Sequence, residues 1–492
     1  MLNPLEIGVT LGGQLLDLFV PRPKPRAGCS AEPILLSQRT VTRTAPTRTG
    51  NVAPSVSTFA VKFLGCKVSQ ADVTLARQAL LAAGYTEAPE AEAELQVVNT
   101  CCITREAEAK SRQSVRRSLR GARQVYVTGC ATNLDAEQFA SIDERVRPLV
   151  GTADDVAAML GAEVGDSAVE VGGCADVEHE VLFASPGRLS SGRTRGFVKV
   201  QDGCDCHCAY CIIPTVRGRA RSRPAGAVLA EVRRRVASGQ PEMVMTGISV
   251  GDYRDPERGL ELGQLMMEVA RVPGVERVRL SSVEVIHVKD SLLAALAGEP
   301  KVCSHLHIPL QSGDDGVLEA MGRHYSAAEY VEQVQTLRAA VPNVNVTTDV
   351  IVGFPTENEA AFRRTLEVVE AAGISRVHSF SYSPRPGTVS AALGDRVTPE
   401  EKKDRSQRLR GHSEVRSRLH RAAKLGAPAR VLIDKVAETQ CSGYTEDYTR
   451  CYLPAGAGPR GAIVDAVFRD LHADGIRCEP AGEEIRCQPA YP

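Results

Sequence analysis

Two successive runs of alternating strand-like and helix-like segments constrain this fold most. The first run covers residues 58 to about 150, and its apolar strand-like segments are FAVKFLG, ELQVVNT and QVYVTG. Strands that alternate with helical patterns predict parallel sheets whose crossover connections are helices. We therefore expect an open parallel α/β sheet in this part of the chain.

The second run covers residues 196 to about 395 and contains six strand-helix units of similar length. Its strand-like segments are FVKVQDG, EMVMTGI, RVRLSSV, HLHIPLQ, VNVTTDVIVG and RVHSFSYS. Six such units favour a partly closed (β/α)6 barrel, with chemistry at the carboxyl ends of the strands. Residues 398–424 predict a basic helix, and the short strands with Gly and Pro turns that follow predict a small β-barrel.

Composition narrows the class of protein. Apolar residues at 43% and charged residues at 24% are ordinary for a soluble globular chain, and a net charge of -1 means that any anion-binding surface must be local. No apolar run reaches the roughly 18 residues of a membrane helix, so no membrane partner is expected. Residues 1–57 lack a secretory leader and are rich in Pro, Thr, Ser and Arg, which predicts a disordered N-terminal extension.

The sharpest chemical signal is the loop QDGCDCHCAYCIIP, in which Cys204, Cys208 and Cys211 have the spacing C-x3-C-x2-C directly after a strand. Three thiolates on one loop can hold a [4Fe-4S] cluster and leave its fourth iron without a protein ligand. A structural zinc site would need a second pair of ligands at knuckle spacing, and a thioredoxin-like pair would leave Cys204 idle. Cys206 lies between these positions as a bystander.

Three further cysteines share a position relative to the strands. Cys66 follows FAVKFLG, Cys101 follows ELQVVNT, and Cys130 follows QVYVTG. The carboxyl ends of parallel strands converge on one crevice, so the three side chains are expected to form one site. A single cysteine would more often be a small buried apolar residue, whereas three equivalent positions predict a second three-thiolate cluster. With fifteen cysteines, an odd number without framework spacing, we expect a reducing cytoplasm.

Several motifs in one order resemble the radical S-adenosylmethionine methylthiotransferases. They are GCKVSQ, NTCCIT, VTGC, CDCHCAYCIIPTVRGRARSR, HLHIPLQSGDDGVLEAMGR, DVIVGFP and YSPRPGT, and GYTEDYTRCYLP is similar to the signature of the RNA-binding TRAM barrel. The resemblance implies an N-terminal methylthiotransferase domain with the auxiliary cluster at 58–180, a radical S-adenosylmethionine core at 190–420 and a TRAM-like domain at 424–490. The chain departs from the family pattern at Ser69 and Thr356.

The resemblance also implies the reaction. GCKVSQ and YSPRPGT look most like the branch that adds a methylthio group to carbon 2 of N6-threonylcarbamoyladenosine at position 37 of tRNA. The hydrogen on that carbon is not usefully acidic, so a His or Glu base cannot activate it and radical chemistry is required. Two [4Fe-4S] clusters, S-adenosylmethionine, tRNA and a cytoplasmic electron donor such as a flavodoxin are implied.

Other residues are candidates for cofactor or substrate contact. The resemblance implies that Tyr210 contacts the adenine of the cofactor, and the remaining candidates lie at strand ends: Thr246, Gly247, Ser282, Gln311 and Val352. Arginine forks suit phosphate, and two segments are rich in them. These residues are Arg217, Arg219, Arg221 and Arg223, then Arg112, Arg116, Arg117, Arg120 and Arg123.

Three alternative functions stay open at this point. The same apparatus serves a branch that acts on N6-isopentenyladenosine in tRNA and a branch that acts on an aspartate of a ribosomal protein. From another class comes a non-enzymatic iron-sulfur protein that binds RNA and senses redox state. Only the enzymes predict turnover of S-adenosylmethionine.

Overall fold

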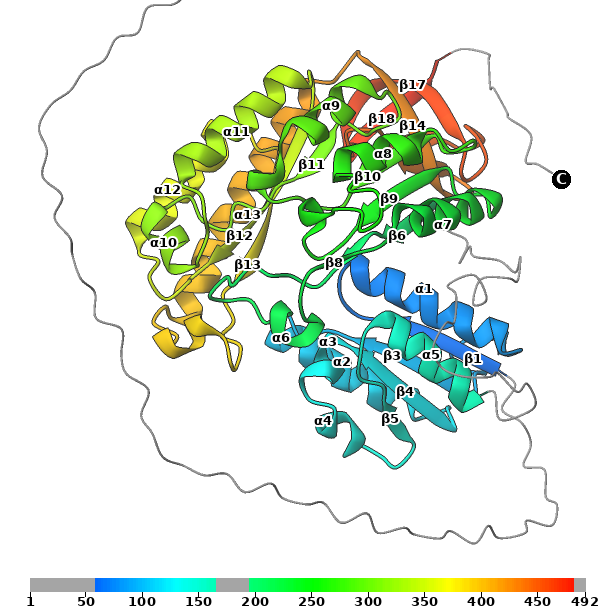
Figure 1. Cartoon of the computed structure of the whole chain (residues 1–492). Helices are drawn as coiled ribbons and strands as arrows, with labels where there is room; N and C mark the ends of the chain where they lie inside the picture. Colours follow the sequence, from blue (N-terminus) through cyan, green and yellow to red (C-terminus); the bar gives the residue numbers. More distant parts are fainter. Residues whose placement is uncertain (1–57, 165–193, 482–492) are drawn as a thin grey trace, which may run out of the picture. The chain divides into compact units, whose positions relative to one another are not determined.

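The first strand-helix run folds into a parallel five-stranded sheet with the order β2-β1-β3-β4-β5. The computed structural model describes residues 58–164 and 194–481 (Figure 1). The strands are β1 (Thr58–Phe63), β2 (Thr86–Glu87), β3 (Leu95–Thr100), β4 (Gln124–Gly129) and β5 (Val146–Pro148). The helices are α1 (Lys67–Ala82), α2 (Arg105–Ser118), α3 (Cys130–Leu134), α4 (Glu137–Ala140) and α5 (Ala153–Val164).

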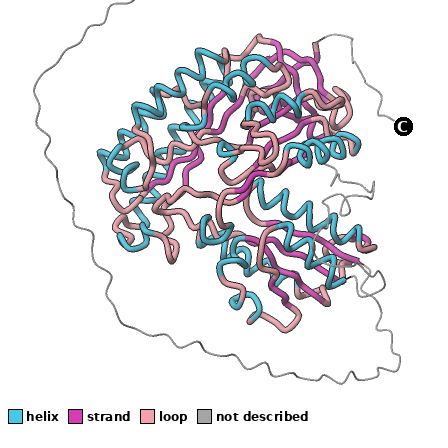
Figure 2. Tube along the Cα trace, in the orientation of Figure 1, coloured by secondary structure: helices cyan, strands magenta, loops and turns pink. Residues whose placement is uncertain are grey.

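Helices cover both faces of this sheet, because successive residues of a strand point to opposite sides. Val97 packs in an apolar cluster with residues of α1 and α5, whereas its neighbour Val98 packs in a second cluster with residues of α2 and α4. Both valines are fully buried. Helices on both faces leave all six residues of β3 buried, and Figure 2 shows the strands between the helices.

The second run folds into six parallel strands in two three-stranded sheets, β10-β9-β6 and β11-β12-β13. The strands are β6 (Arg195–Lys199), β9 (Glu242–Thr246), β10 (Arg277–Leu280), β11 (His305–His307), β12 (Asn345–Val352) and β13 (Arg376–Ser381). A parallel bridge from Val278 on β10 to Val302 connects the two sheets, and the amide of Cys303 donates to the Val278 carbonyl at 2.8 Å. The six strands therefore form one series, as expected for a partial barrel.

A helix follows each of these strands. Five of the connections carry α7 (Ala225–Ala237), α8 (Leu262–Ala270), α9 (Asp290–Gly298), α10 (Asp315–Ala320) with α11 (Ala327–Ala340), and α12 (Glu359–Ala371). The connection after β6 also holds the short antiparallel strands β7 (Gln201–Asp202) and β8 (Arg221–Ser222) with α6 (Ile213–Arg217) between them. The cysteine loop thus leaves the barrel at the carboxyl end of its first strand.

Helix α13 (Pro399–Ala422) follows β13 and ends the barrel. It begins with a capping box, in which the Thr398 hydroxyl accepts from the Glu401 amide and the Glu401 carboxylate accepts from the Thr398 amide. Pro399 occupies the first turn, where the missing N–H is not needed. Along its length the helix packs on β13, where the Ser413 hydroxyl accepts from the Val377 amide at 2.8 Å.

The C-terminal segment forms a closed β-barrel with the strand order β14-β15-β16-β18-β17. Its strands are β14 (Pro428–Val436), β15 (Gln440–Tyr444), β16 (Arg450–Pro454), β17 (Ile463–His472) and β18 (Gly475–Pro480). Cys441, Cys451 and Cys478 are buried in its core. Closure leaves no strand edge unpaired, which a small all-β unit requires for stability.

The expected fold class is confirmed: an open parallel α/β sheet, a partial (β/α)6 barrel and a small β-barrel follow one another. The short strands β2 and β5, at the two edges of the open sheet, and β18, within the closed barrel, were not predicted, since two to six residues carry little pattern. The domain limits 58–180, 190–420 and 424–490 remain predictions. The disordered extension predicted for residues 1–57 lies outside the described residues, and none of the described helices has the length and apolarity to cross a membrane.

Candidate functional site: two cysteine triads beside a basic pocket

The first cysteine triad lies on the loop between β7 and α6. The loop begins at Gly203, whose φ of +70° favours glycine, and a β-carbon there would lie 1.9 Å from the Arg219 carbonyl oxygen. Two backbone hydrogen bonds hold the loop, from Cys204 to the Gly218 carbonyl at 3.1 Å and from Cys211 to the Cys208 carbonyl at 3.0 Å. The backbone therefore fixes the three cysteines without help from their side chains.

An arginine from another part of the barrel contacts this triad. Arg323 Nη1 donates to Cys208 Sγ at 3.3 Å and also pairs with Glu284 at 3.0 Å. Burial raises the pKa of the Cys211 thiol to about 11, and the negative charge that Cys208 can carry raises it further, while Arg323 acts in the opposite direction. Metal binding requires the thiolate form, so the positive charge of Arg323 favours metal binding here.

The second triad is assembled by the open sheet. Strands β1, β3 and β4 are direct neighbours, and Cys66, Cys101 and Cys130 follow their carboxyl ends. Thr100 and Gly129 are register partners, so Cys101 and Cys130 each lie one residue beyond a paired position. The predicted convergence of three strand ends is therefore present in the described structure.

Two glycines make room for this convergence. Gly129 has a φ of +97°, and a β-carbon there would lie 2.6 Å from the Thr100 carbonyl oxygen. At Gly65, with a φ of +131°, a β-carbon would lie 2.6 Å from Ser69 Oγ and 3.5 Å from Cys101 Cβ. The hydroxyl of Ser69, where the chain departs from the family pattern, lies 3.8 Å from Cys66 Sγ. Ser69 is therefore a neighbour of the triad.

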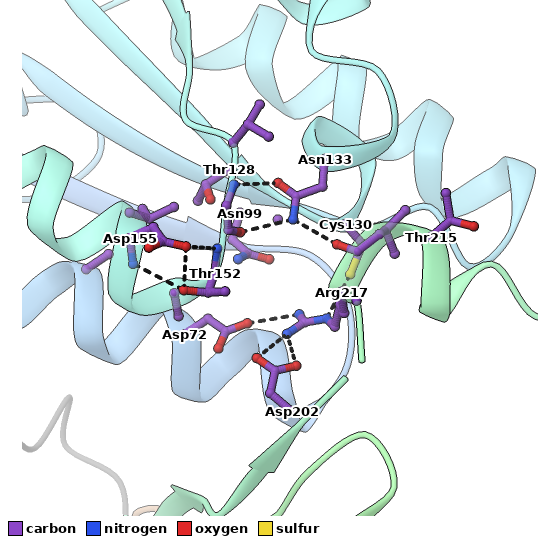
Figure 3. Close-up of a pocket in the computed structure, with 18 of the residues that line it drawn as sticks. Asp72, Asn99, Thr128, Cys130, Asn133, Thr152, Asp155, Asp202, Thr215 and Arg217 are labelled. Carbon is purple, nitrogen blue, oxygen red and sulfur yellow. Dashed lines mark hydrogen bonds and ion pairs between the residues drawn. The ribbon is translucent and has the colours of Figure 1, made fainter. Parts of the chain in front are cut away.

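A buried ion network supports the second triad (Figure 3). Arg217 Nε donates to Cys130 Sγ at 3.2 Å, and the same guanidinium pairs with Asp72 at 2.9 Å and Asp202 at 3.1 Å. Lys199 completes the network with bonds to both carboxylates, at 2.7 and 3.1 Å. Burial raises the pKa of Cys130 to about 11 and opposes ionisation of Asp202, but Lys199 and Arg217 hold the pKa of Asp202 at about 2.

The network borders a pocket of about 260 Å³ beside Cys130, shown in Figure 3. Its lining comes from the open sheet and from the segment around α6, and includes Asn133, which donates to the carbonyls of Gly151 and Val216. The open sheet and the cysteine loop of the barrel are thus connected by hydrogen bonds and by ion pairs.

Both triads border one apolar cluster. Cys130 and Cys102 are buried in it with Ile212, which follows the first triad directly, and Cys204 and Cys211 pack against it. Among the described residues no three His, Cys, Asp or Glu side chains are close enough to hold a single metal ion. A cubane binds each thiolate through a different iron, so the sulfur atoms must be farther apart than around one ion. Each set of three thiols supplies the donors that a [4Fe-4S] cluster with one open iron requires.

A second pocket, of about 200 Å³, opens beside the first triad. Its lining includes Tyr210, Cys211, Gln311, Asp349 and Ile351. The structure thereby brings together two of the predicted cofactor residues, Tyr210 and Gln311. Gln311 has a φ of +66°, and its amide donates to the Asp349 carbonyl at 2.9 Å. Aromatic and aliphatic walls with a few polar groups are typical of a pocket for a nucleoside-containing cofactor.

The other predicted cofactor residues lie at strand ends outside the lining of this pocket. Thr246 ends β9, and its buried hydroxyl has no hydrogen-bond partner among the described residues. Gly247 packs closely on Gln201, and Ser282 is partly exposed after β10. The Val352 side chain is fully buried, and its neighbour Ile351 lines the pocket instead.

The first arginine-rich segment is not a continuous phosphate-binding surface. Arg217 is used in the buried network, and Arg223 pairs with Glu231 at 2.7 Å. Arg219 and Arg221 are exposed. In the second segment Arg112 pairs with Glu108 at 2.7 Å, and the other four arginines are exposed. The fold, and not the spacing in the sequence, separates the arginines of the first segment into internal and external sets.

A basic pocket of about 290 Å³ was not predicted from the sequence. It lies where the barrel, α13 and the C-terminal β-barrel meet, and its lining includes Lys67, His305, His307, Arg376 and His378. Lys67 directly follows Cys66 of the second triad, and the pair His305 and His307 alternates along β11. These two patterns were the only hints of the pocket in the sequence. The fold is needed to bring Lys67 and the two histidines to one cavity.

Two family models match the chain. Residues 198–369 match the Radical SAM superfamily, and residues 58–151 match the family described as Uncharacterized protein family UPF0004. The threonylcarbamoyladenosine tRNA methylthiotransferase MtaB of Thermotoga maritima is 35% identical over 80% of this chain and 91% of its own length. The tRNA-2-methylthio-N(6)-dimethylallyladenosine synthase of Geobacter metallireducens is 32% identical over 82% of this chain and 94% of its own.

A solved structure supports the fold. The radical S-adenosylmethionine methyltransferase TsrM from Kitasatospora setae, solved with cobalamin and a [4Fe-4S] cluster bound, superposes with a TM-score of 0.51. The match covers 70% of this chain and 80% of the other at 13% sequence identity. At that identity, the likeness concerns the arrangement of the α/β regions.

Proposed function

Because this chain belongs to the family of radical S-adenosylmethionine methylthiotransferases, we propose that it adds a methylthio group to carbon 2 of N6-threonylcarbamoyladenosine at position 37 of tRNA. It is an enzyme that transfers methylthio groups, and its cofactors are S-adenosylmethionine and [4Fe-4S] clusters. We propose the substrate, the modified base and the residues that hold the cofactors.

The observation that carries the proposal is the pair of thiol triads on one apolar cluster. We assign the radical cluster to Cys204, Cys208 and Cys211, beside the pocket of Tyr210 and Gln311. The auxiliary cluster is assigned to the other triad, Cys66, Cys101 and Cys130. Transfer of a methylthio group to an unactivated carbon needs both a radical source and a sulfur donor, so two centres close to one another suit the reaction.

Bound S-adenosylmethionine supplies a radical that can remove a hydrogen atom from an unactivated carbon. The residues of this chain bind and orient the cofactor and keep water away from it. We assign Tyr210 and Gln311 to contact with the cofactor, because both line this pocket, and Ile351 contributes an apolar wall to it. The unpaired hydroxyl of Thr246 is a further candidate contact, because a buried hydroxyl without a partner costs free energy that a ligand can recover.

The experiment that tests the proposal is mass spectrometry of nucleosides from total tRNA of a strain that lacks the gene. Loss of 2-methylthio-N6-threonylcarbamoyladenosine with accumulation of its unthiolated precursor is expected, and the wild-type gene should restore the product. A matched control is the Cys208→Ala gene, which should not restore it. An unchanged nucleoside profile would contradict the proposal.

Relatives of similar identity carry two different substrate names, so the isopentenyladenosine reaction is the second candidate. Loss of 2-methylthio-N6-isopentenyladenosine in the same experiment would favour it. A change in the mass of a ribosomal protein would favour the aspartate reaction, and no turnover of S-adenosylmethionine at all would favour the redox sensor. We further propose that the enzyme acts in the cytoplasm with an electron donor such as a flavodoxin.

A further inference from the structure

The basic pocket has a chemical character that neither cysteine triad explains. Four cationic side chains and four histidines contribute to its lining, but Asp474 is the sole carboxylate among the lining residues. Asp474 already pairs with Arg450 at 2.7 Å and accepts a hydrogen bond from the Tyr452 hydroxyl at 2.5 Å. Positive charge in the pocket is therefore not balanced from within it.

Two of the cations have no counter-ion among the described residues. The Lys67 ammonium is half-buried, and its one hydrogen bond goes to the Ser281 carbonyl at 3.2 Å. Arg376, on β13, is exposed at the mouth of the pocket and makes no hydrogen bond or ion pair within the described parts of the chain. A partly buried cation such as Lys67 costs free energy when it has no ion-pair partner, and Arg376 adds a second free positive charge to the same cavity, so the pocket favours an anionic ligand.

The histidines add hydrogen-bonding groups to the same cavity. His307 Nδ1 lies 2.9 Å from the Thr347 hydroxyl, and the His307 ring lies 5.6 Å from that of His378. Buried His305 has an Nδ1 atom without a hydrogen-bond partner in the described structure. The ligand is therefore polar as well as anionic, unlike an isopentenyl group, which is a hydrocarbon.

The pocket is next to the reacting groups. Lys67 is bonded to Cys66 along the chain, and His307 Nε2 lies 3.1 Å from Asp349 Oδ1, which belongs to the pocket of Tyr210 and Gln311. Carbon 2 and carbon 6 of adenine flank the same ring nitrogen, so a substituent on N6 lies close to carbon 2. A base whose carbon 2 faces the triads can thus extend its N6 substituent toward Lys67.

We propose that this pocket binds the carboxylate of the threonylcarbamoyl group, with Lys67 and Arg376 as the residues that determine specificity. The inference rests on the proposed function and says how the enzyme selects a threonylcarbamoyl group over an uncharged substituent on N6. A phosphate of the anticodon loop offers the same negative charge, and the experiment separates the two sources.

The test measures binding of anticodon stem-loop RNAs to the reconstituted holoenzyme by fluorescence anisotropy. Two RNAs of one sequence are compared, with N6-threonylcarbamoyladenosine or plain adenosine at position 37. The wild-type enzyme should bind the modified RNA more tightly, and Lys67→Gln should reduce that preference by about tenfold, as expected for the loss of one charge-assisted hydrogen bond. Arg376→Gln should act in the same direction, and Lys67→Arg should retain most of the preference.

The matched control is Lys403→Gln, which removes one exposed positive charge from α13 outside the pocket. It should leave the preference unchanged. Equal weakening of both RNAs by Lys67→Gln and Arg376→Gln would assign the pocket to a backbone phosphate and overturn the proposal. Iron content of each variant is measured, and if Lys67→Gln loses iron then Arg376→Gln decides the outcome.

Failure of the inference and failure of the proposed function are distinguishable. If the wild-type enzyme does not thiolate the threonylcarbamoyl RNA, the proposed function fails. If it thiolates that RNA and both variants keep the full binding preference, only the role of this pocket is wrong.

Discussion

The two cysteine triads are assembled in different ways. One triad lies within eight residues of chain, on a loop fixed by backbone hydrogen bonds and by Gly203. The other gathers Cys66, Cys101 and Cys130 from three strands that only the sheet order makes neighbours. A local motif can therefore be recognised by its spacing, whereas a dispersed site depends on the packing that assembles it.

In each triad one sulfur atom accepts a hydrogen bond from an arginine. The two arginines differ in which regions of the chain their ion pairs connect. Arg323 pairs with Glu284, so its contacts remain within the barrel. Arg217 pairs with Asp72 of the open sheet and with Asp202 beside the cysteine loop. The arginine of the dispersed triad therefore connects two α/β regions through ion pairs, whereas the ion pair of the arginine beside the local triad stays within the barrel.

The largest effect is expected for Cys208→Ala. Removal of this thiol should abolish reductive cleavage of S-adenosylmethionine, because three thiolates are needed to hold a cluster with one open iron. Formation of 5'-deoxyadenosine by the reduced, reconstituted protein is the readout. Cleavage at the wild-type rate would mean that the radical cluster is held elsewhere and that the local triad has another role.

Cys101→Ala should separate the two triads. We expect loss of about half of the bound iron and of all methylthio transfer, while cleavage of S-adenosylmethionine continues. Iron analysis measures the bound cluster, and nucleoside mass spectrometry measures methylthio transfer. The control is Cys102→Ala, which changes the adjacent buried thiol, whose pKa burial raises to about 12, and should retain the iron. Unchanged iron in Cys101→Ala would refute the second cluster.

Arg217→Met should loosen the connection between the open sheet and the barrel. The substitution leaves the Asp72 carboxylate with Lys199 alone and the Asp202 carboxylate with Lys199 and the more distant Arg221, and breaking a buried pair in this way costs on the order of 3 kcal/mol. Hydrogen exchange is expected to increase in α1 and α6. Arg323→Met is the matched variant, and its exchange changes should be confined to the barrel. If the two variants increased exchange in α1 equally, Arg217 would not be the specific connection between the open sheet and the barrel.

The smallest effect is expected for Cys206→Ser. This cysteine lies between two proposed ligands, and its amide donates to Cys204 Sγ at 3.4 Å, a bond that serine retains. Iron content and cleavage of S-adenosylmethionine should equal those of the wild-type protein. A loss of iron would show that the loop uses a different set of three thiols.

The fold class of each region and the local triad could be predicted from the amino-acid sequence. Strand-helix alternation predicted the parallel sheets, because the hydrophobic period of each segment is a local property. The positions of Cys66, Cys101 and Cys130 after strands predicted their convergence, since parallel strands end at the same edge of a sheet. Tyr210 and Gln311 were named from the chain alone, and the structure places both at one pocket.

Only the tertiary structure decided how charges are paired. In the sequence, Arg217 and Arg219 look equivalent, yet one is buried between two carboxylates and the other is exposed. In the same way, nothing local brings Lys67 to Arg376, which lies more than 300 residues further along the chain. Pairing depends on distances between residues remote in sequence, and a pattern along the chain contains no such distances.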